Sequence, residues 1–168
     1  VQFLADLIYK YKVAPKATLT RDMGTSDMFL TGKVAMCTYG RWMCMQFKHI
    51  KDFQWDVAEL PSKEKRAATL FTVCYAVSSK TKHPDAAWKL VKYLTGAVGQ
   101  KATARSGHAI PSDKTIANTD DFLKAPVIPI KLDAKVFLDS IEYSYPTPTN
   151  LVFNEINTLI IREMDVVW

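Results

Sequence analysis

The residues of this sequence whose types and placement could do chemistry are aromatic side chains in stretches expected to be loops. An aromatic face beside hydroxyl, amide or guanidinium donors suits sugar binding, because a pyranose ring has an apolar C–H face and polar edges. The same residue types also fill hydrophobic cores, so the pattern alone is a weak signal. The residues concerned are Tyr39, Trp42, Tyr75, Tyr143, Tyr145 and Phe153.

Trp42 is the aromatic residue with the most informative surroundings. It follows Gly40 by two residues, where the end of a short predicted strand should meet the next helix. Such a position commonly holds a ligand, which would make Trp42 a stacking platform. The alternative is a core anchor that packs beside Met43 and Phe47, and the stretch alone favours this alternative.

Catalytic motifs are missing from the sequence. The six glycines stand singly and form no phosphate-binding loop, and no Gly-x-Ser-x-Gly elbow is present. His49, His83 and His108 do not stand beside a nucleophile. We therefore expect neither an enzyme nor a bound cofactor.

The three cysteines, Cys37, Cys44 and Cys74, lie in apolar contexts. The spacing of Cys37, Cys44 and His49 matches no standard zinc site, so no metal site is expected. Buried free thiols are the favoured interpretation, and a single disulfide stays open as an alternative.

Length and composition describe an ordinary globular chain. With 168 residues, 48% of them hydrophobic, it can form one domain or two small ones. The net charge of +5 is scattered rather than gathered into a basic stripe, so nucleic-acid binding is not expected. No apolar run is long enough for a transmembrane helix. The first twelve residues resemble the middle of a helix, so the chain looks like a piece whose start lies upstream.

Hydrophobic periodicity predicts the order of helices and strands. A polar loop should occupy 13–24, and a cap at Ser112 or Asp113 should begin one helical turn. In the helix after Pro84, Leu90 is expected to be buried. Helices are predicted at 1–12, between Asp27 and Gly32, and at 42–50, 84–95, 98–104, 130–143 and 151–164, and strands at 34–36, 53–61 and 70–78.

The order of several short motifs resembles a known family, the extracellular solute-binding proteins of ABC sugar importers, in particular the relatives of maltose-binding protein. The similarity covers nearly all of this chain but only the C-terminal half or so of such a protein. The motifs are the stretches 29–36, 40–42, 55–61, 75–80 and 84–89.

The resemblance implies a fold and a division of the chain. The fold would be α/β, a periplasmic-binding-protein-like (type II) two-lobed structure, of which this chain is a C-terminal fragment. Residues 1–58 would belong to the C-terminal lobe, 59–130 to the N-terminal lobe, and 131–168 would return to the C-terminal lobe. The upstream N-terminal half of the same protein would complete the structure.

The resemblance also implies ligand-binding residues. Trp42 matches an aromatic residue that stacks on sugar in the cleft, which reverses the preference for a core role. Tyr39 and Arg41 flank it as polar partners, and Phe153 stands where relatives often place a tryptophan. The segment 71–73 replaces a glycine-rich piece of the family, which places Thr72 near the ligand. Tyr145 completes the expected set.

The expected function is solute binding, with a sugar or oligosaccharide as ligand, as the substrate-binding component of an ABC transporter. Its partner would be the transmembrane permease subunits, and its location extracytoplasmic, in the periplasm or as a lipoprotein anchored at the outer face of the membrane. One alternative keeps the fold and binds a polyamine, a phosphate ester or a peptide. The others are an enzyme on a similar scaffold and a truncated interaction module.

Overall fold

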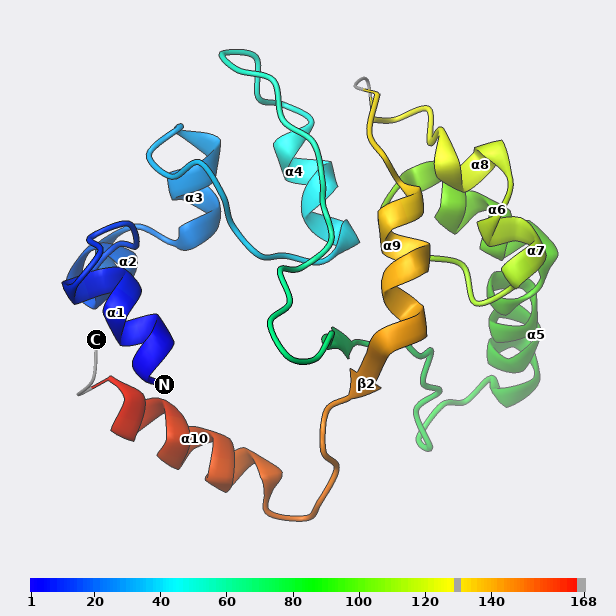
Figure 1. Ribbon diagram of the computed structural model, residues 1–168. Coiled ribbons are helices and arrows are strands. Elements are labelled where there is room, and N and C mark those ends of the chain that lie inside the picture. Colours follow the sequence, from blue (N-terminus) through cyan, green and yellow to red (C-terminus); the bar gives the residue numbers. More distant parts are fainter. Residues whose placement is uncertain (129–130, 166–168) are drawn as a thin grey trace. The chain divides into compact units, whose positions relative to one another are not determined.

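A computed structural model describes residues 1–128 and 131–165 of the chain (Figure 1). The chain divides into two units. Unit 1 contains Val1–Cys37 and the segment that starts at Pro148, and unit 2 contains Thr38–Thr147. The lobe boundaries expected near residues 58 and 130 stay a prediction.

Unit 1 is built from helices. Helices α1 and α10 confirm the two amphipathic helices predicted there, whereas α2 lies inside the segment predicted as a polar loop. Among the described residues of unit 1, the buried apolar side chains are Met28 and Phe29, which belong to α3. An ion pair of 3.0 Å joins Arg21 and Asp165. The helices are α1 (Gln2–Tyr9), α2 (Ala17–Asp22), α3 (Thr25–Leu30) and α10 (Phe153–Met164).

The strand predicted at 34–36 is wrong. Gly32 has a φ of 68° and turns the chain after α3, as expected for a glycine at a helix end. The segment that follows is irregular, and the Met36 side chain is 87% exposed. A strand needs a neighbour for its backbone hydrogen bonds, and both strands of the described structure lie elsewhere in the chain.

Unit 2 begins with the helical turns that carry Trp42. The 3₁₀ turn η1 (Arg41–Met43) leads directly into α4 (Cys44–Phe47), which is shorter than the helix predicted at 42–50. The side chains of Met43, Cys44 and Phe47 are buried. This segment therefore anchors the chain just beyond Gly40.

The strand predicted at 53–61 is absent, although its burial pattern is correct. Phe53, Trp55 and Val57 are half-buried, and the residues between them are exposed. No described strand pairs with this segment. It is held by side-chain contacts instead, among them the Asp56 carboxylate, which accepts a hydrogen bond of 3.1 Å from the N–H of Asp133.

The sheet is smaller than expected and differently placed. Strand β1 (Ala68–Leu70) pairs in parallel with β2 (Ser144–Pro146), with Thr69 opposite Tyr145. The strand predicted at 70–78 overlaps β1 only at Leu70. Its apolar residues further on are exposed, because no described strand continues the ladder beside them. The described structure is therefore helix-rich with a small parallel sheet.

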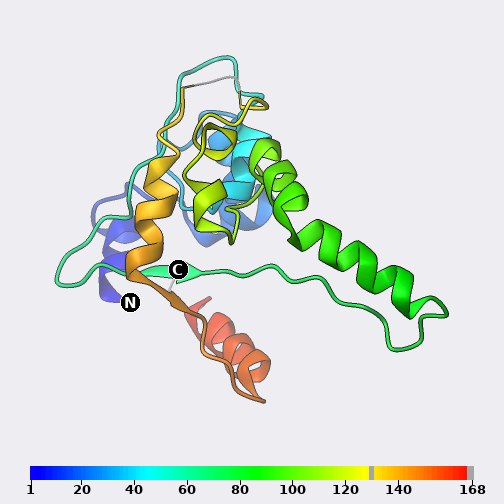
Figure 2. The same cartoon turned by 90° about the vertical axis from the view of Figure 1, so that its right-hand side faces the viewer.

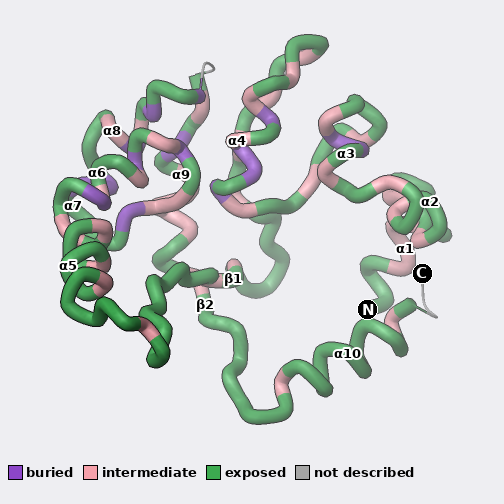
Figure 3. Tube along the Cα trace, turned by 180° about the vertical axis from the view of Figure 1, so that it is seen from behind, coloured by how far each residue is buried: buried purple, intermediate pink, exposed green. Residues whose placement is uncertain are grey.

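Helices α6, α7 and α8, with the N-cap residue of α9, contribute a buried cluster of unit 2. Helices α5 and α6 follow one another along the chain (Figure 2), and α6 packs against α5, α7 and α8. The buried cluster consists of Ala104, Ile116, Phe122 and Ala134. Figure 3 shows buried segments, in purple, among α6 to α9. The helices are α5 (Pro84–Thr95), α6 (Ala97–Ser106), α7 (Lys114–Ala117), α8 (Asp120–Leu123), α9 (Lys135–Asp139) and the 3₁₀ turn η2 (Ser140–Tyr143).

The local predictions for α5, α7 and α9 differ in outcome. Asp113 caps α7, as predicted, by accepting hydrogen bonds from the N–H groups of Thr115 and Ile116. The helix predicted at 130–143 begins at Lys135 instead, and residue 130 lies outside the described residues. The predicted burial of Leu90 is wrong, since it is 57% exposed. The inner face of α5 is formed by Ala87, Val91 and Leu94, a fraction of a turn away.

Candidate ligand-binding site

Trp42 presents its indole at the surface of unit 2. Its side chain is 40% exposed, whereas its neighbours Met43 and Phe47 are buried. The ring meets Phe71 edge to face, with 5.7 Å between the ring centroids and an angle of 82°. The core-anchor interpretation of Trp42 is therefore wrong, and the indole is supported at one edge and open elsewhere.

Gly40 makes the space in which the indole lies. A Cβ atom at this position would stand 2.1 Å from Cζ3 of Trp42, well inside contact distance. The backbone of Gly40 has a φ of −88°, which any residue can adopt, so the requirement is for space rather than for conformation. The ring thus lies directly over the Gly40 backbone, in a defined position.

Tyr39 provides a second exposed aromatic face. It is 41% exposed and rests edge to face on the buried ring of Phe47, with centroids 6.0 Å apart. Phe47 in turn meets Trp55 at 5.7 Å. Tyr39 is therefore anchored by Phe47 and leaves its phenol ring partly exposed.

Arg41 differs from its two neighbours because its side chain is only 4% exposed. Its guanidinium lies over the rings of Phe122, at 4.8 Å, and Phe137, at 5.3 Å. Its Nη2 donates a long hydrogen bond of 3.5 Å to the carbonyl of Phe122. Burial lowers the pKa of Arg41 from its usual value. The guanidinium does not share the exposed surface of Tyr39 and Trp42.

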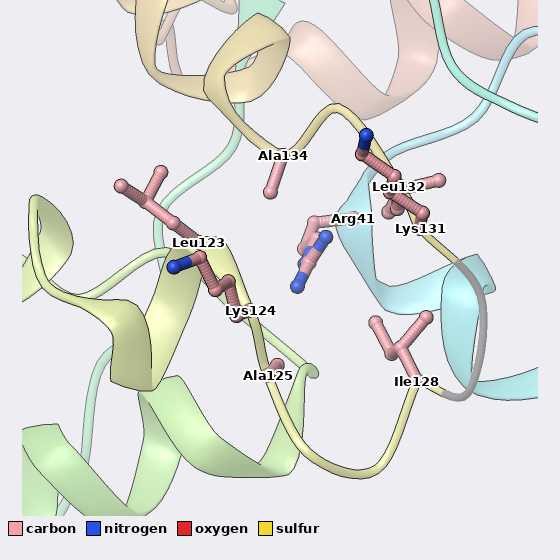
Figure 4. Close-up of a pocket in the computed structure, with 8 residues that line it drawn as sticks. All are labelled: Arg41, Leu123, Lys124, Ala125, Ile128, Lys131, Leu132 and Ala134. Carbon is pink, nitrogen blue, oxygen red and sulfur yellow. The ribbon is translucent and has the colours of Figure 1, made fainter.

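A pocket of about 140 Å³ lies beside Arg41 (Figure 4). Two lysines that the sequence analysis did not single out, Lys124 and Lys131, belong to its wall. Nothing in their local sequence distinguishes them from other surface lysines, since they come together only through the fold. The remaining lining residues are Leu123, Ala125, Ile128, Leu132 and Ala134.

The other candidates lie in different places. Tyr145 on β2 is 51% exposed and has Lys65 Nζ 4.9 Å from its ring centroid. Thr72 is exposed and directly follows Phe71, the ring that supports Trp42. Phe153 is half-buried at the start of α10, in unit 1. Phe71 was missed as a site residue, although its apolar ring in a predicted ligand segment was a usable signal.

The described residues contain no group of three or more His, Cys, Asp or Glu side chains that could hold a metal ion. In the same part of the chain, no helix is long and apolar enough to cross a membrane. The three cysteines are free; Cys44 is buried, but Cys74 is exposed, so its predicted burial is wrong.

Anchored, solvent-facing aromatic rings and a small pocket are both typical of a protein that binds a solute. The family model of bacterial extracellular solute-binding proteins matches residues 1–130, so the chain belongs to this family. No curated protein and no solved structure matches the chain.

Membership of this family confirms the broader expectations from the sequence. The protein is an extracytoplasmic solute-binding protein of an ABC transporter, and its partners are a small-molecule solute and the permease. Proteins of this family typically bind without catalysing a reaction. Family membership also implies a periplasmic-binding-protein-like fold, with which a helix-rich chain carrying a small parallel sheet is compatible.

Proposed function

We propose that this protein binds a sugar or an oligosaccharide for an ABC importer, with Trp42 as the stacking residue. The observation that carries the proposal is the position of the indole, which is 40% exposed and held by Gly40 and Phe71. A ring fixed before the ligand arrives loses little conformational freedom on binding, so more of the contact energy appears as affinity.

The neighbouring residues supply the polar contacts that a sugar requires. Tyr39 presents a hydroxyl that both donates and accepts, and Thr72 presents a second one beside Phe71. Tyr145 offers a further exposed ring in unit 2, and Phe153 offers a half-buried one in unit 1. We assign Trp42 and Tyr39 the principal roles, and Thr72, Tyr145 and Phe153 secondary ones.

The transport step proposed here is a shift between open and closed forms. A solute that contacts both lobes favours the closed form, and the permease recognises that form. The lobes would be those expected from the sequence, with boundaries near residues 58 and 130. This mechanism requires no metal and no cofactor. A polyamine, a phosphate ester or a peptide is the alternative ligand. Calorimetric titration with each of these compounds distinguishes it from a neutral sugar.

The proposal is tested by calorimetric titration of the protein with a panel of neutral mono- and oligosaccharides. We expect saturable binding of at least one sugar, and Trp42→Ala should weaken it at least tenfold, which corresponds to about 1.4 kcal/mol. Because Trp42 is substantially exposed, its replacement should change the melting temperature by only a few degrees.

The matched control is Trp88→Ala, which removes a tryptophan that is 58% exposed on α5. Sugar affinity should be unchanged in this variant. Binding that survives Trp42→Ala, or that Trp88→Ala abolishes instead, would contradict the assignment of the stacking residue. A folded protein that binds none of the sugars but does bind a polyamine or a peptide would replace the ligand class.

A further inference from the structure

Two nitrogens of the buried Arg41 guanidinium lack a hydrogen-bond acceptor in the described part of the chain. Among the described residues, neither Nε nor Nη1 has a hydrogen-bond partner, and the bond from Nη2 to the Phe122 carbonyl is long, at 3.5 Å. A buried charge is costly unless its hydrogen bonds are satisfied. The Nε–H and Nη1–H groups of Arg41 therefore need acceptors, and the described part of the chain does not supply them.

The groups packed around Arg41 do not fill this need. The faces of Phe122 and Phe137 attract the positive charge but carry no oxygen. The Cys44 sulfur is a hydrogen-bond partner of the guanidinium: burial raises the pKa of this thiol, the interaction with Arg41 opposes that rise, and a thiol sulfur is only a weak acceptor. No ion pair within the described ranges involves Arg41. Its guanidinium nevertheless stays charged at neutral pH.

The residues that line the pocket beside Arg41 carry the positive charge that attracts an anion. Figure 4 shows the guanidinium pointing into the pocket, between the segment 123–125 on one side and Lys131 to Ala134 on the other. The lining residues that the structure describes include three basic side chains and no carboxylate. Lys124 already pairs with Asp120 at 3.0 Å, whereas Lys131 has no ion pair among the described residues.

A second orphaned donor lies in the same neighbourhood. The indole N–H of Trp55 is buried and has no described partner. Trp55 packs against the cluster of Cys44, Ala125 and Ile128, two of which also line the pocket. Unsatisfied donors without matching acceptors thus gather in this part of unit 2, which is unusual for a protein interior.

We propose that this pocket is an oxyanion-binding site, in which Nε–H and Nη1–H of Arg41 donate to the charged oxygens and Lys131 adds attraction at the rim. The volume of about 140 Å³ suits a carboxylate or phosphate group rather than an entire oligosaccharide. The group can belong to a small free acid or be a substituent of a larger solute. The proposal is independent of the sugar surface at Trp42, since Trp42 does not line the pocket.

The experiment titrates the full chain, at constant ionic strength, with acetate, with inorganic phosphate and with glucuronate, using glucose as the uncharged comparison. The readouts are calorimetry and the NMR signal of the Arg41 Nε–H group, which should shift when an oxygen accepts from it. We expect saturable binding of at least one anion. Arg41→Met should weaken it at least tenfold, and Lys131→Gln should weaken it several-fold.

The control variant is Lys101→Gln, which removes an exposed lysine on α6 outside the pocket and should leave anion binding unchanged. Binding of acetate or phosphate alone would support a site for a free anion. Binding of glucuronate but not of glucose would support a site for an acidic substituent.

Two results would overturn the proposal. One is the failure of all three anions to bind or to shift the Arg41 signal in the folded protein. The other is anion binding that responds to Lys101→Gln as strongly as to Lys131→Gln, because it would then reflect net charge alone. If Arg41→Met does not fold, the Arg41 signal in the unaltered protein and the two lysine variants still decide between these outcomes.

Discussion

At the scale of single residues, Gly40 and Trp42 act as a pair. The absence of a side chain at Gly40 allows the indole to lie over the backbone, and the indole in turn is the surface proposed to meet the sugar. A substitution at Gly40 should therefore weaken sugar binding, although glycine itself has no side chain to contact the sugar.

We predict that Gly40→Ala weakens sugar binding while the protein stays folded. The added Cβ would collide with atoms at the far end of the Trp42 ring, and a half-exposed ring can move away at little cost. Stability should change by about 1 kcal/mol or less, because the backbone conformation at Gly40 suits alanine. Calorimetry and thermal melting measure the two effects, with Gly24→Ala as a control whose Cβ meets nothing closer than 3.7 Å. Unchanged affinity in Gly40→Ala would mean that the position of the indole does not matter.

The sequence predicted part of this site and missed the rest for a physical reason. The exposed ring of Trp42 follows a glycine, and that local signal was visible. Arg41 was expected beside it at the surface, but consecutive residues of a helical turn point in different directions. Its burial depends on Phe122 and Phe137, which are far away in sequence. A pocket formed by such distant segments leaves no local pattern.

At the scale of elements, α8 contributes the largest fully buried side chain among the described residues. Phe122 is 0% exposed and belongs to the cluster with Ala104, Ile116 and Ala134. Its ring also faces the Arg41 guanidinium. This short helix therefore connects the hydrophobic core to the proposed anion pocket.

We predict that Phe122→Ala destabilises the protein by about 3–5 kcal/mol, as for a fully buried aromatic residue. The comparison variant is Leu90→Ala on α5, where 57% exposure predicts a change of about 0.5 kcal/mol or less. Chemical denaturation monitored by circular dichroism measures both. If Leu90→Ala proved as damaging as Phe122→Ala, the inner face of α5 would have to include Leu90.

The cap of α7 gives a prediction about pH. Hydrogen bonds from the hydroxyl of Thr115, at 2.6 Å, and from its N–H, at 2.8 Å, hold the pKa of Asp113 below its ordinary value of 3.8. Because the pKa of Asp113 is lower in the folded protein than its ordinary value, the ionised cap stabilises the folded protein fully above pH 3.8. This stabilisation is lost as the pH falls through the folded-state pKa. Asp113→Ala should therefore lower the melting temperature at neutral pH, and the difference should shrink in acid.

Asp113→Asn is the matched control for this cap, because asparagine caps a helix without a charge. At neutral pH its melting temperature should lie between those of the unaltered protein and the Asp113→Ala variant. If the difference between the unaltered protein and Asp113→Ala stays constant down to acid pH, the carboxylate charge plays no part in the cap.

Strands were predicted less successfully than helices, for a physical reason. Amphipathic helices such as α5 and α10 satisfy their own backbone hydrogen bonds, so local periodicity identifies them. A strand depends on a partner that local sequence does not reveal. The segment from Phe53 to Val57 shows the predicted alternation in burial without a described partner strand, and so it is not part of a sheet.

At the scale of the whole molecule, burial is distributed unevenly between the two units. Most of the buried apolar residues among those described belong to unit 2, whereas unit 1 contributes Met28 and Phe29. Helices α1 and α10, all of whose residues are described, contain no buried residue. Local stability follows burial, so these helices should open more readily than α6 to α8.

Hydrogen exchange followed by mass spectrometry tests this ranking. We predict slow exchange in α6, α7 and α8 and fast exchange in α1 and α10, with the short exposed segment near Met36 as an internal reference for fast exchange. If α10 exchanged as slowly as α6, its apolar residues would have to be covered in solution. The family assignment itself was accessible from the order of motifs, since order is preserved even where local structure is mispredicted.

The most direct test of the central claim is an NMR titration of the indole N–H signals of the four tryptophans. The Trp42 signal is assigned by comparison with Trp42→Phe, and neutral sugars are added to the unaltered protein. We predict that one sugar shifts the Trp42 signal saturably and leaves the signal of Trp88 in place. A folded protein in which no sugar moves the Trp42 signal, or in which Trp88 responds instead, would contradict sugar binding at Trp42.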